Sequence, residues 1–383
     1  MVVILAIGAS LAGGCGGGVS ANDRGGNDAR TNGNPDAAVD AKDAAPDVGP
    51  PETWDGGMVD RSPADSADPS PEDGASSDAS ADTTGADASP KTLCGFTVPN
   101  PASSGLPNAA VYDNSVPDVV TDKITGLAWE ASLRGRTPPP GCSADSRGQL
   151  RCPLRYAADY CASNRLGGHS DWRLPTIHEL ISLVNVMARE PAMDATAFPD
   201  APFDAIVWSS TRMAGRPDLA WFVGFYQGSQ QVGFIDNPLR VRCVRVAATS
   251  PERCYEEGAR FTLQDELAFD KATGLTWRRN DSASEGKNWT DAAAYCTSLG
   301  DGFRMPSINE LTTILDFSQS PSTGHMIDVK VFPRPNDWYW SSSAIVGEYP
   351  DVNAGVWSLT FAEGSRATAT ESTVGINRTR CVR

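Results

Sequence analysis

The spacing of apolar and polar residues divides the chain into two unlike parts. Over residues 16–91 the few apolar residues follow neither helical nor strand spacing. After residue 94, short patterned segments begin. Residues 154–168 carry apolar side chains at helical spacing and end in Gly167–Gly168. This pattern predicts a helix that is closed by a glycine C-cap.

Two further helices are predicted by their start signals. Thr176–Glu179 and Ser307–Glu310 both fit the S/T-x-x-E capping box, in which the hydroxyl and the carboxylate each accept a hydrogen bond from an amide at the helix start. We expect these helices to continue over residues 178–187 and 309–317. The segments TGLxW, WSS, WxxxFxxG and RCVR are short, apolar or alternating, and bounded by turn residues, so they predict strands.

These segments occur twice, in the same order. DKITGLAWE at Asp122 returns as DKATGLTWR at Asp270, and WRLPTIHEL at Trp172 returns as FRMPSINEL at Phe303. The first copy holds an insertion of about 13 residues, which contains Cys142 and Cys152. We therefore expect two copies of one α+β domain, each with two helices and a small, mainly antiparallel sheet. Their expected bounds are 94–247 and 252–383.

Charge separates the same two parts. The 383-residue chain has a formal net charge of −16, of which residues 16–91 carry −11. A tract so rich in Ala, Asp, Pro and Ser cannot bury enough apolar surface to fold, so we expect residues 16–93 to be a disordered linker. The alternative to a plain linker is an acidic segment that binds a basic partner or a metal ion. An acidic chain is a poor partner for nucleic acid, and no run of 18 apolar residues predicts a membrane span.

The first 15 residues predict export. Val2–Ala12 is apolar, and Ala12, Gly13 and Gly14 precede a lone Cys15, as in a bacterial lipoprotein signal whose cysteine is lipidated. Leu would be preferred at Ala12, and no basic residue precedes the apolar stretch, so a plain secretory signal is the alternative. We expect a lipid anchor in the bacterial cell envelope, at the outer membrane or the cell surface.

The remaining eight cysteines form an even set, which predicts disulfides in an oxidising compartment. Because Cys161 and Cys243 in copy one match Cys296 and Cys381 in copy two, a repeated bond must lie within each copy. This predicts Cys161–Cys243 and Cys296–Cys381. Cys142 should then pair with Cys152 inside the insertion, and Cys94 with Cys254 by elimination. No CxxC occurs, so we expect no zinc site, and we expect no cofactor.

The ordered series TGLxW, YC, WRLPTxxEL, WSS, WxxxFxxG and RCVR resembles the Lcl C-terminal domain family over roughly residues 94–383. The resemblance implies a C-type lectin-like fold, with a cysteine bond from the first helix to the last strand. RLPTxxEL also resembles the helix start of formylglycine-generating sulfatase-modifying enzymes, which share that fold. The resemblance implies binding at the envelope or surface, with adhesion to glycans, and supplies no shared catalytic residue.

Comparing matched positions in the two copies helps to separate catalytic or binding residues from structural ones. Glu179 and Glu310 are candidate general acids or cation ligands, but the capping box already explains them. The recurring arginines are interpreted as structural, with an anion- or uronate-binding patch as the alternative; they are Arg173, Arg304, Arg242, Arg245, Arg380 and Arg383. His169, His178 and His325 lack histidine counterparts and are interpreted as ordinary polar residues.

Aromatic residues are the candidate sugar-binding groups. The recurring tryptophans are interpreted as core residues; they are Trp129, Trp277, Trp208, Trp340, Trp221 and Trp357. Trp338 and Tyr339 have no aromatic counterparts in copy one, so we expect them to be exposed. Calcium-dependent sugar binding has only the weak signal Pro335–Asn336–Asp337.

Three hypotheses about function remain. The favoured one is a non-catalytic envelope lipoprotein that displays two lectin-like domains for ligand binding or adhesion, with polysaccharide as the candidate ligand. The second is an enzyme on the same fold, which a cleft lined by arginines and carboxylates of one copy would favour. The third is a purely structural envelope component.

Overall fold

The computed structural model describes residues 92–95, 97–201, 205–247, 254–256, 258–281, 286–333, 337–345, 355–362, 364, 366–370 and 377–383. The predicted signal peptide, Cys15 and the linker up to residue 91 lie outside these ranges. Within them, no helix has the length and apolar character needed to cross a membrane.

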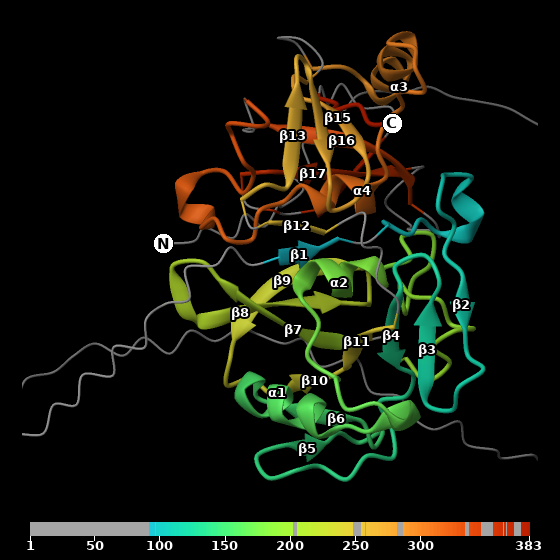
Figure 1. Ribbon diagram of the computed structural model, residues 1–383, viewed down its shortest axis with the longest axis vertical. Coiled ribbons are helices and arrows are strands. Elements are labelled where there is room, and N and C mark those ends of the chain that lie inside the picture. Colours follow the sequence, from blue (N-terminus) through green and yellow to red (C-terminus); the bar gives the residue numbers. More distant parts are fainter. Residues whose placement is uncertain are drawn as a thin grey trace, which may run out of the picture. The chain divides into compact units, whose positions relative to one another are not determined.

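Copy one combines two α-helices with two sheets (Figure 1). The helices are α1 (Leu154–Ser163) and α2 (Ile177–Ser182). The strands are β2 (Tyr112–Asp113), β3 (Val119–Asp122), β4 (Leu127–Glu130), β5 (Ser143–Ala144), β6 (Leu150–Cys152), β7 (Ile206–Met213), β8 (Arg216–Gly224), β9 (Ser229–Phe234), β10 (Leu239–Arg240) and β11 (Val244–Val246). One sheet has the order β5-β6-β10-β7-β8-β9 and the other β11-β4-β3-β2. All their pairings are antiparallel except that of β10 with β7.

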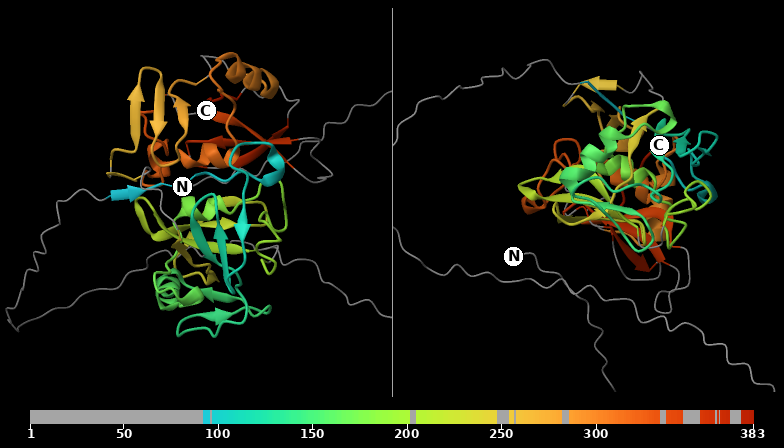
Figure 2. Two further views of the ribbon diagram at one scale, coloured as in Figure 1. Left: turned by 45° about the vertical axis from the view of Figure 1, so that its right-hand side comes forward. Right: turned by 90° about the horizontal axis from the view of Figure 1, so that it is seen from below.

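Copy two repeats this plan (orange to red in Figure 2). Its helices are α3 (Trp289–Ser298) and α4 (Ile308–Thr313). Its strands are β13 (Phe261–Gln264), β14 (Leu267–Asp270), β15 (Thr276–Arg278), β16 (Trp338–Ala344), β17 (Gly355–Thr360) and β18 (Arg366–Thr370), in sheets ordered β13-β14-β15 and β16-β17-β18. The predicted fold class, two α+β copies with mainly antiparallel sheets, is confirmed.

Three helices end earlier than predicted. Helix α1 ends at Ser163, and Gly167 and Gly168 lie in a separate 3₁₀ turn (Leu166–Gly168) rather than at a C-cap. Helix α2 spans only Ile177–Ser182, and α4 is equally short. The apolar residues that follow leave the helix because they fill the core as irregular chain; Leu183, Val184 and Val186 are all buried there.

Two short strands pair with each other, and one lies ahead of the repeated motifs of each copy. β1 (Thr92–Cys94) and β12 (Cys254–Glu256) pair antiparallel, with Cys94 directly opposite Cys254. Directly opposite residues of an antiparallel pair lie about 4.5–5.5 Å apart at Cα, which is within the span of a disulfide. The backbone is therefore compatible with the predicted Cys94–Cys254 bond, whose side chains lie outside the description.

The two copies share one hydrophobic core rather than forming separate modules. A single cluster of buried side chains includes Trp129, Trp221 and Val184 of copy one together with Trp277 and Phe317 of copy two. The rings of Trp221 and Phe317 meet edge to face, with centroids 4.9 Å apart. A smaller cluster on the other side of each sheet surrounds the disulfide of that copy. Each main sheet is therefore covered on both faces.

Close packing explains the last glycine of the WxxxFxxG motif. Gly228 and Gly364 occupy the same motif position, and their φ angles are 76° and 67°. A Cβ added to Gly228 would lie only 2.4 Å from Cγ1 of Val184, in the loop after α2. A side chain would be both strained and blocked there, so glycine is required.

Candidate functional site

The recurring carboxylates are structural. Each closes the capping box that the sequence predicts, and each also receives a two-pronged ion pair from an arginine of its own copy. The guanidinium nitrogens of Arg173 lie 2.8 and 2.6 Å from the carboxylate oxygens of Glu179. Those of Arg304 both lie 2.7 Å from Glu310. Both carboxylates are occupied by these contacts, which supports the structural interpretation over a general acid.

The other recurring arginines also contact groups of the chain itself. Arg242 is buried and donates to the backbone oxygen of Ala131 at 2.9 Å, and Arg380 is buried and donates to that of Arg278 at 3.2 Å. Burial lowers the pKa of Arg242 to about 10. Two exposed acidic residues pair with the remaining arginines: Asp171 lies 2.7 Å from Arg245, and Asp301 lies 3.6 Å from Arg383. These contacts favour the structural interpretation over an anion-binding patch.

The recurring tryptophans are core residues, as predicted. Trp129, Trp208, Trp277 and Trp340 have no exposed surface, and Trp221 and Trp357 are 5% exposed. Of the two unmatched aromatics, Trp338 is 37% exposed, as expected, whereas Tyr339 is fully buried. The prediction for Tyr339 was wrong because both faces of β16 are covered: Tyr339 points into the shared core and Trp340 into the cluster around Cys296–Cys381.

The three histidines do not form a site. His169 is exposed, and His325 lies in a loop after the 3₁₀ helix Pro321–Thr323. His178 lies where the copies meet, and its Nε2 donates to the backbone oxygen of Leu315 at 3.1 Å. Among the described residues, no group of three or more His, Cys, Asp or Glu side chains could hold a metal ion. Pro335 and Asn336 lie outside the description.

Three disulfides join the cysteines as the repeat predicts: Cys161–Cys243, Cys296–Cys381 and Cys142–Cys152. The first two each tie the first helix of a copy to the segment that ends it. Such bonds are typical of an oxidising compartment outside the cytoplasm.

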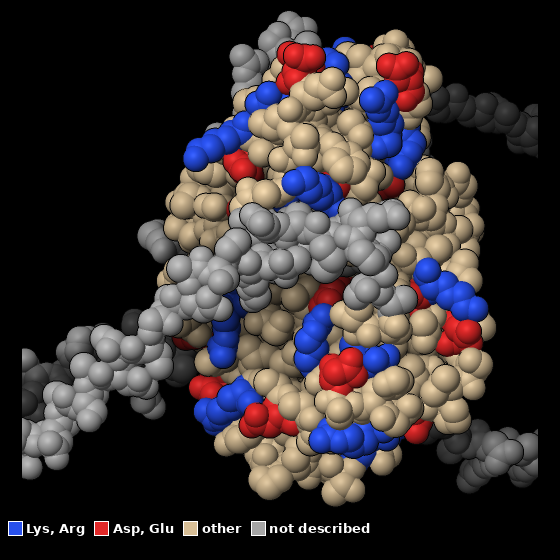
Figure 3. All heavy atoms as spheres, in the orientation of Figure 1, with Lys and Arg blue, Asp and Glu red and all other residues tan. Residues whose placement is uncertain are grey.

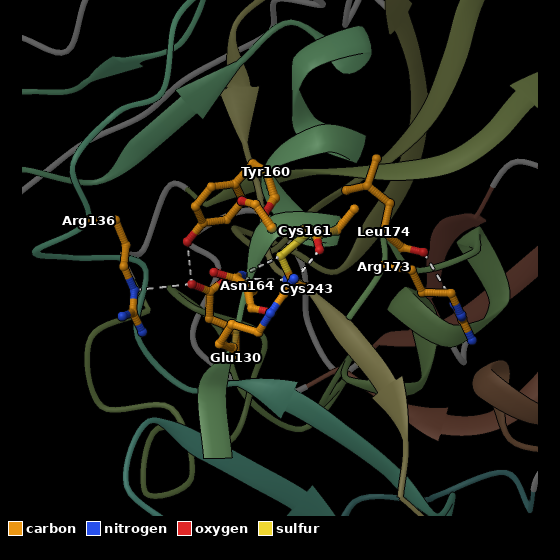
Figure 4. Close-up of a disulfide and its surroundings, with 11 residues drawn as sticks. Glu130, Arg136, Tyr160, Cys161, Asn164, Arg173, Leu174 and Cys243 are labelled. Carbon is orange, nitrogen blue, oxygen red and sulfur yellow. Dashed lines mark hydrogen bonds and ion pairs between the residues drawn. A yellow bond between two sulfur atoms is a disulfide. The ribbon is translucent and has the colours of Figure 1, made fainter. Parts of the chain in front are cut away.

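One buried carboxylate with polar partners is specific to copy one (Figure 4). Glu130 is fully buried, accepts a hydrogen bond from Tyr160 Oη at 2.6 Å, and lies 3.3 Å from Nε of Arg136. Burial raises the pKa of Glu130. Copy two has Arg278 at the matching position. Sequence reasoning missed this cluster because Arg136 belongs to the segment that copy two lacks. Its burial beside the Cys161–Cys243 bond makes it a packing feature rather than a substrate-binding cleft.

A second polar cluster is specific to copy two and reaches the surface. Arg378 donates from Nη1 to Asp281 at 3.3 Å and from Nε to Asp337. Tyr339 donates to the same Asp281 at 3.0 Å. Burial raises the pKa of Tyr339 to about 12, so it remains a neutral donor. The exposed indole of Trp338 follows Asp337 directly. We call Asp281, Asp337, Trp338, Tyr339 and Arg378 the strand-end cluster, because it lies at the start of β16.

Copy one is apolar at four of the five matching positions. Leu133, Ala205, Ile206 and Val207 take the places of Asp281, Asp337, Trp338 and Tyr339. The arginine is retained: Arg240 pairs with Val207 on the backbone just as Arg378 pairs with Tyr339.

The insertion closes this end of copy one. Strand β6 pairs with β10, so the β5–β6 hairpin extends the sheet next to Arg240. Arg240 donates to Gln149 Oε1 at 2.7 Å and to Asp145 Oδ2 at 3.0 Å, and its side chain is only 3% exposed. The side chain of Arg378 is 18% exposed. Among the described residues, only copy two therefore has an exposed aromatic that adjoins a polar cluster in the chain at this strand end.

The sequence could have indicated part of this cluster. Asp281 stands where copy one has a leucine, and such one-copy polar residues are detectable by aligning the repeats. Its contact with Arg378, 97 residues away, follows only from the fold.

A family comparison agrees with the repeat. The model of the Lcl C-terminal domain matches residues 118–245 and again residues 266–383. A search of curated proteins found no match. Since the two matched ranges cover more than half of the 383 residues, the chain belongs to the Lcl C-terminal domain family, with the domain present in two tandem copies.

Proposed function

We propose that this protein is a non-catalytic ligand-binding protein of the bacterial cell envelope, which binds polysaccharide through the strand-end cluster of its second copy. The observation that carries the proposal is the exposed indole of Trp338, which directly follows Asp337 of the Asp337–Arg378 ion pair in the chain. An exposed aromatic ring offers an apolar face to a sugar ring, and ion-paired polar groups offer hydrogen bonds to hydroxyls. Surface adhesion is the role that such a site would serve.

The matched position in copy one supplies the control. Ile206 is 38% exposed and Trp338 is 37% exposed, so truncating either removes a similarly exposed side chain from the same place in the fold. On a glycan array, the full chain should bind a subset of polysaccharides, Trp338→Ala should lose that binding, and Ile206→Ala should retain it. Equal loss in both variants, or in neither, would argue against this site.

The alternatives predict different outcomes on the same array. An enzyme on this fold would convert the polysaccharide that it binds, whereas a binding protein releases it unchanged in length and composition. The copy-one cluster around Glu130 gives the enzyme hypothesis little support, because that carboxylate has no exposed surface. A purely structural component would bind no polysaccharide.

We also propose that Cys15 anchors the chain to the membrane through lipid. The support is the apolar stretch Val2–Ala12 followed by small residues and this cysteine. Cys15→Ser should move the protein from the membrane fraction to the soluble fraction. Retention of the variant in membranes would exclude the anchor.

A further inference from the structure

The repeated motif DKxTG places a buried aspartate at the end of one strand in each copy. Asp122 ends β3 and Asp270 ends β14, and neither side chain has exposed surface. Oδ1 of Asp122 accepts a hydrogen bond from the amide of Ile124 at 2.8 Å, and Oδ1 of Asp270 accepts one from the amide of Ala272 at 3.0 Å. Each aspartate therefore shapes the turn that follows its strand.

The carboxylate of copy two is fully paired. Arg260 donates from Nε to Oδ1 of Asp270 at 2.8 Å and from Nη2 to Oδ2 at 2.7 Å. The hydroxyl of Thr273 also donates to Oδ2, at 2.9 Å. The buried charge of Asp270 is therefore balanced by a guanidinium, and both of its oxygens have partners.

Copy one lacks the matching arginine. The amide of Lys123 donates to the backbone oxygen of Val111 at 2.9 Å. The amide of Lys271 donates in the same way to that of Arg260 at 3.0 Å, so Val111 stands at the position of Arg260. Val111 is 47% exposed and brings no charge. Within the described part of the chain, the buried Oδ2 of Asp122 has no hydrogen-bond partner.

The groups around Asp122 do not balance its charge. Tyr112 of β2 lies directly opposite Asp122. Burial raises the pKa of Tyr112, with Asp122 and Asp194 adding to it, so this tyrosine stays neutral. Acidic and basic side chains lie close together on the surface (Figure 3), as Lys123 and Asp113 do at 3.1 Å. Among the described residues, no lysine, arginine or histidine compensates Asp122 in this way.

An unbalanced buried carboxylate favours its protonated form. Burial raises the pKa of Asp122 above its ordinary value of 3.8, and hydrogen bonds from Ile124 and Thr125 offset this only in part. The folded chain therefore holds this proton more tightly than the unfolded chain does. The stability that the bound proton provides is complete below the ordinary value and is lost as the pH rises through the folded value.

We infer that Asp122 is a pH-sensitive element of copy one, which holds β2 on β3 most firmly when it carries a proton. Because Tyr112 of β2 lies directly opposite, loss of the proton at higher pH leaves an unpaired charge at this strand pair and weakens it. Asp270 does not act in this way, because Arg260 pairs with it.

Matched substitutions in the full chain test the inference by urea unfolding at about pH 4.5 and about pH 8. Each variant is compared with the parent at one pH, so the titration of other groups cancels. At the higher pH, Asp122→Asn should lower the unfolding equilibrium constant about tenfold, because asparagine still accepts from Ile124 and buries no charge. At the lower pH the change should be less than about twofold.

The control Asp270→Asn should have the opposite effect. At the higher pH it should raise the unfolding equilibrium constant at least about tenfold, because it leaves Arg260 without its carboxylate. Val111→Arg supplies the missing guanidinium at an exposed position. In that background, Asp122→Asn should become destabilising, as Asp270→Asn is. An Asp122→Asn variant of the parent that is no more stable than the parent at the higher pH would overturn the inference.

Hydrogen exchange tests the link to β2 separately. After correction for intrinsic rates, the amides that join β2 to β3 should be better protected at the lower pH than at the higher one. In Asp122→Asn their protection should be the same at both. Equal protection at both pH values in the parent would contradict the effect of Asp122 on this strand pair.

Discussion

His178 and Asn309 occupy the same position in the two copies, and each donates a side-chain N–H to a backbone oxygen of the other copy. His178 Nε2 lies 3.1 Å from the oxygen of Leu315, and Asn309 Nδ2 lies 2.9 Å from the oxygen of Val184. Leu315 and Val184 are themselves matched residues. The copies are thus joined by a reciprocal pair of hydrogen bonds, and only one of the two donors titrates.

The first prediction concerns how stability changes with pH. Burial is the main cause that lowers the pKa of His178 to about 4, with nearby Arg260 adding to it, whereas the ordinary value is 6.5. The unfolded chain therefore takes up the proton first. The stability that His178 provides is complete above about pH 6.5 and is lost as the pH falls toward 4.

His178→Asn should retain the hydrogen bond, as Asn309 does. Because asparagine does not titrate, the fall in the free energy of unfolding between pH 7.5 and pH 4.5 should be about 2 kcal/mol smaller in the variant than in the parent. Urea unfolding at both pH values measures the difference. His169→Asn, at an exposed histidine, is the control. The same acid sensitivity in the His178 variant and the parent would refute this role.

The second prediction concerns cooperativity. Phe317 of copy two packs on both Trp221 and His178 of copy one, with ring centroids 4.9 Å apart in each pair. Phe317→Ala should lower the free energy of unfolding by about 3–5 kcal/mol, because it opens a cavity in the shared core.

Hydrogen exchange should then show faster opening of α2 as well as α4, since both copies rest on this ring. The exposed Phe269→Ala in β14 serves as the control and should change little. Faster exchange confined to copy two would mean that the copies unfold independently.

The third prediction compares the two matched ion pairs. Glu310 is fully buried and also accepts from Asn100, whereas Arg173, the partner of Glu179, has a side chain that is 44% exposed. Loss of a buried partner is costly, and loss of an exposed one is screened by water. Glu310→Ala should cost about 3 kcal/mol and Glu179→Ala about 1 kcal/mol. Urea unfolding of the two variants measures both costs, and equal costs would contradict this reading of the burial.

The fourth prediction concerns the disulfides. Cys161–Cys243 and Cys296–Cys381 join residues 82 and 85 positions apart, and Cys142–Cys152 joins residues 10 apart. In the loop-entropy model the long loops stabilise the fold by about 4–5 kcal/mol each and the short one by about 3 kcal/mol. Peptide mapping without reduction should recover these three pairs, and a Cys94–Cys254 pair with them. A Cys161 peptide linked to any other partner would exclude the proposed bond that ties helix to strand.

The repeat made much of the fold predictable. Matched motifs indicated two α+β copies, the capping boxes at Thr176 and Ser307, and the pairing of Cys161 with Cys243. These features are local or recur within a copy, so comparing the copies detects them.

Contacts between the copies were not predictable in the same way. His178 was interpreted as an ordinary polar residue, because its partner, like that of the matched Asn309, is a backbone oxygen more than 120 residues away. Tyr339 was placed wrongly for a related reason. An alternating strand shows which side chains share a face, but not that the shared core covers the second face.

Trp338 was singled out correctly, yet the charged residues of the strand-end cluster were not. Arg378 reads as an unremarkable residue near the C-terminus, and only the fold places it beside Asp281 and Asp337.

Oxidative footprinting of the full chain, with and without a bound polysaccharide from the glycan array, tests the central claim most directly. The exposed residues Trp338 and Phe234 should both be oxidised in the free protein, since they are 37% and 56% exposed. The account predicts that the polysaccharide protects Trp338 at least fivefold and leaves Phe234, in β9 of copy one, unchanged. Protection of Phe234 with Trp338 still oxidised would contradict it.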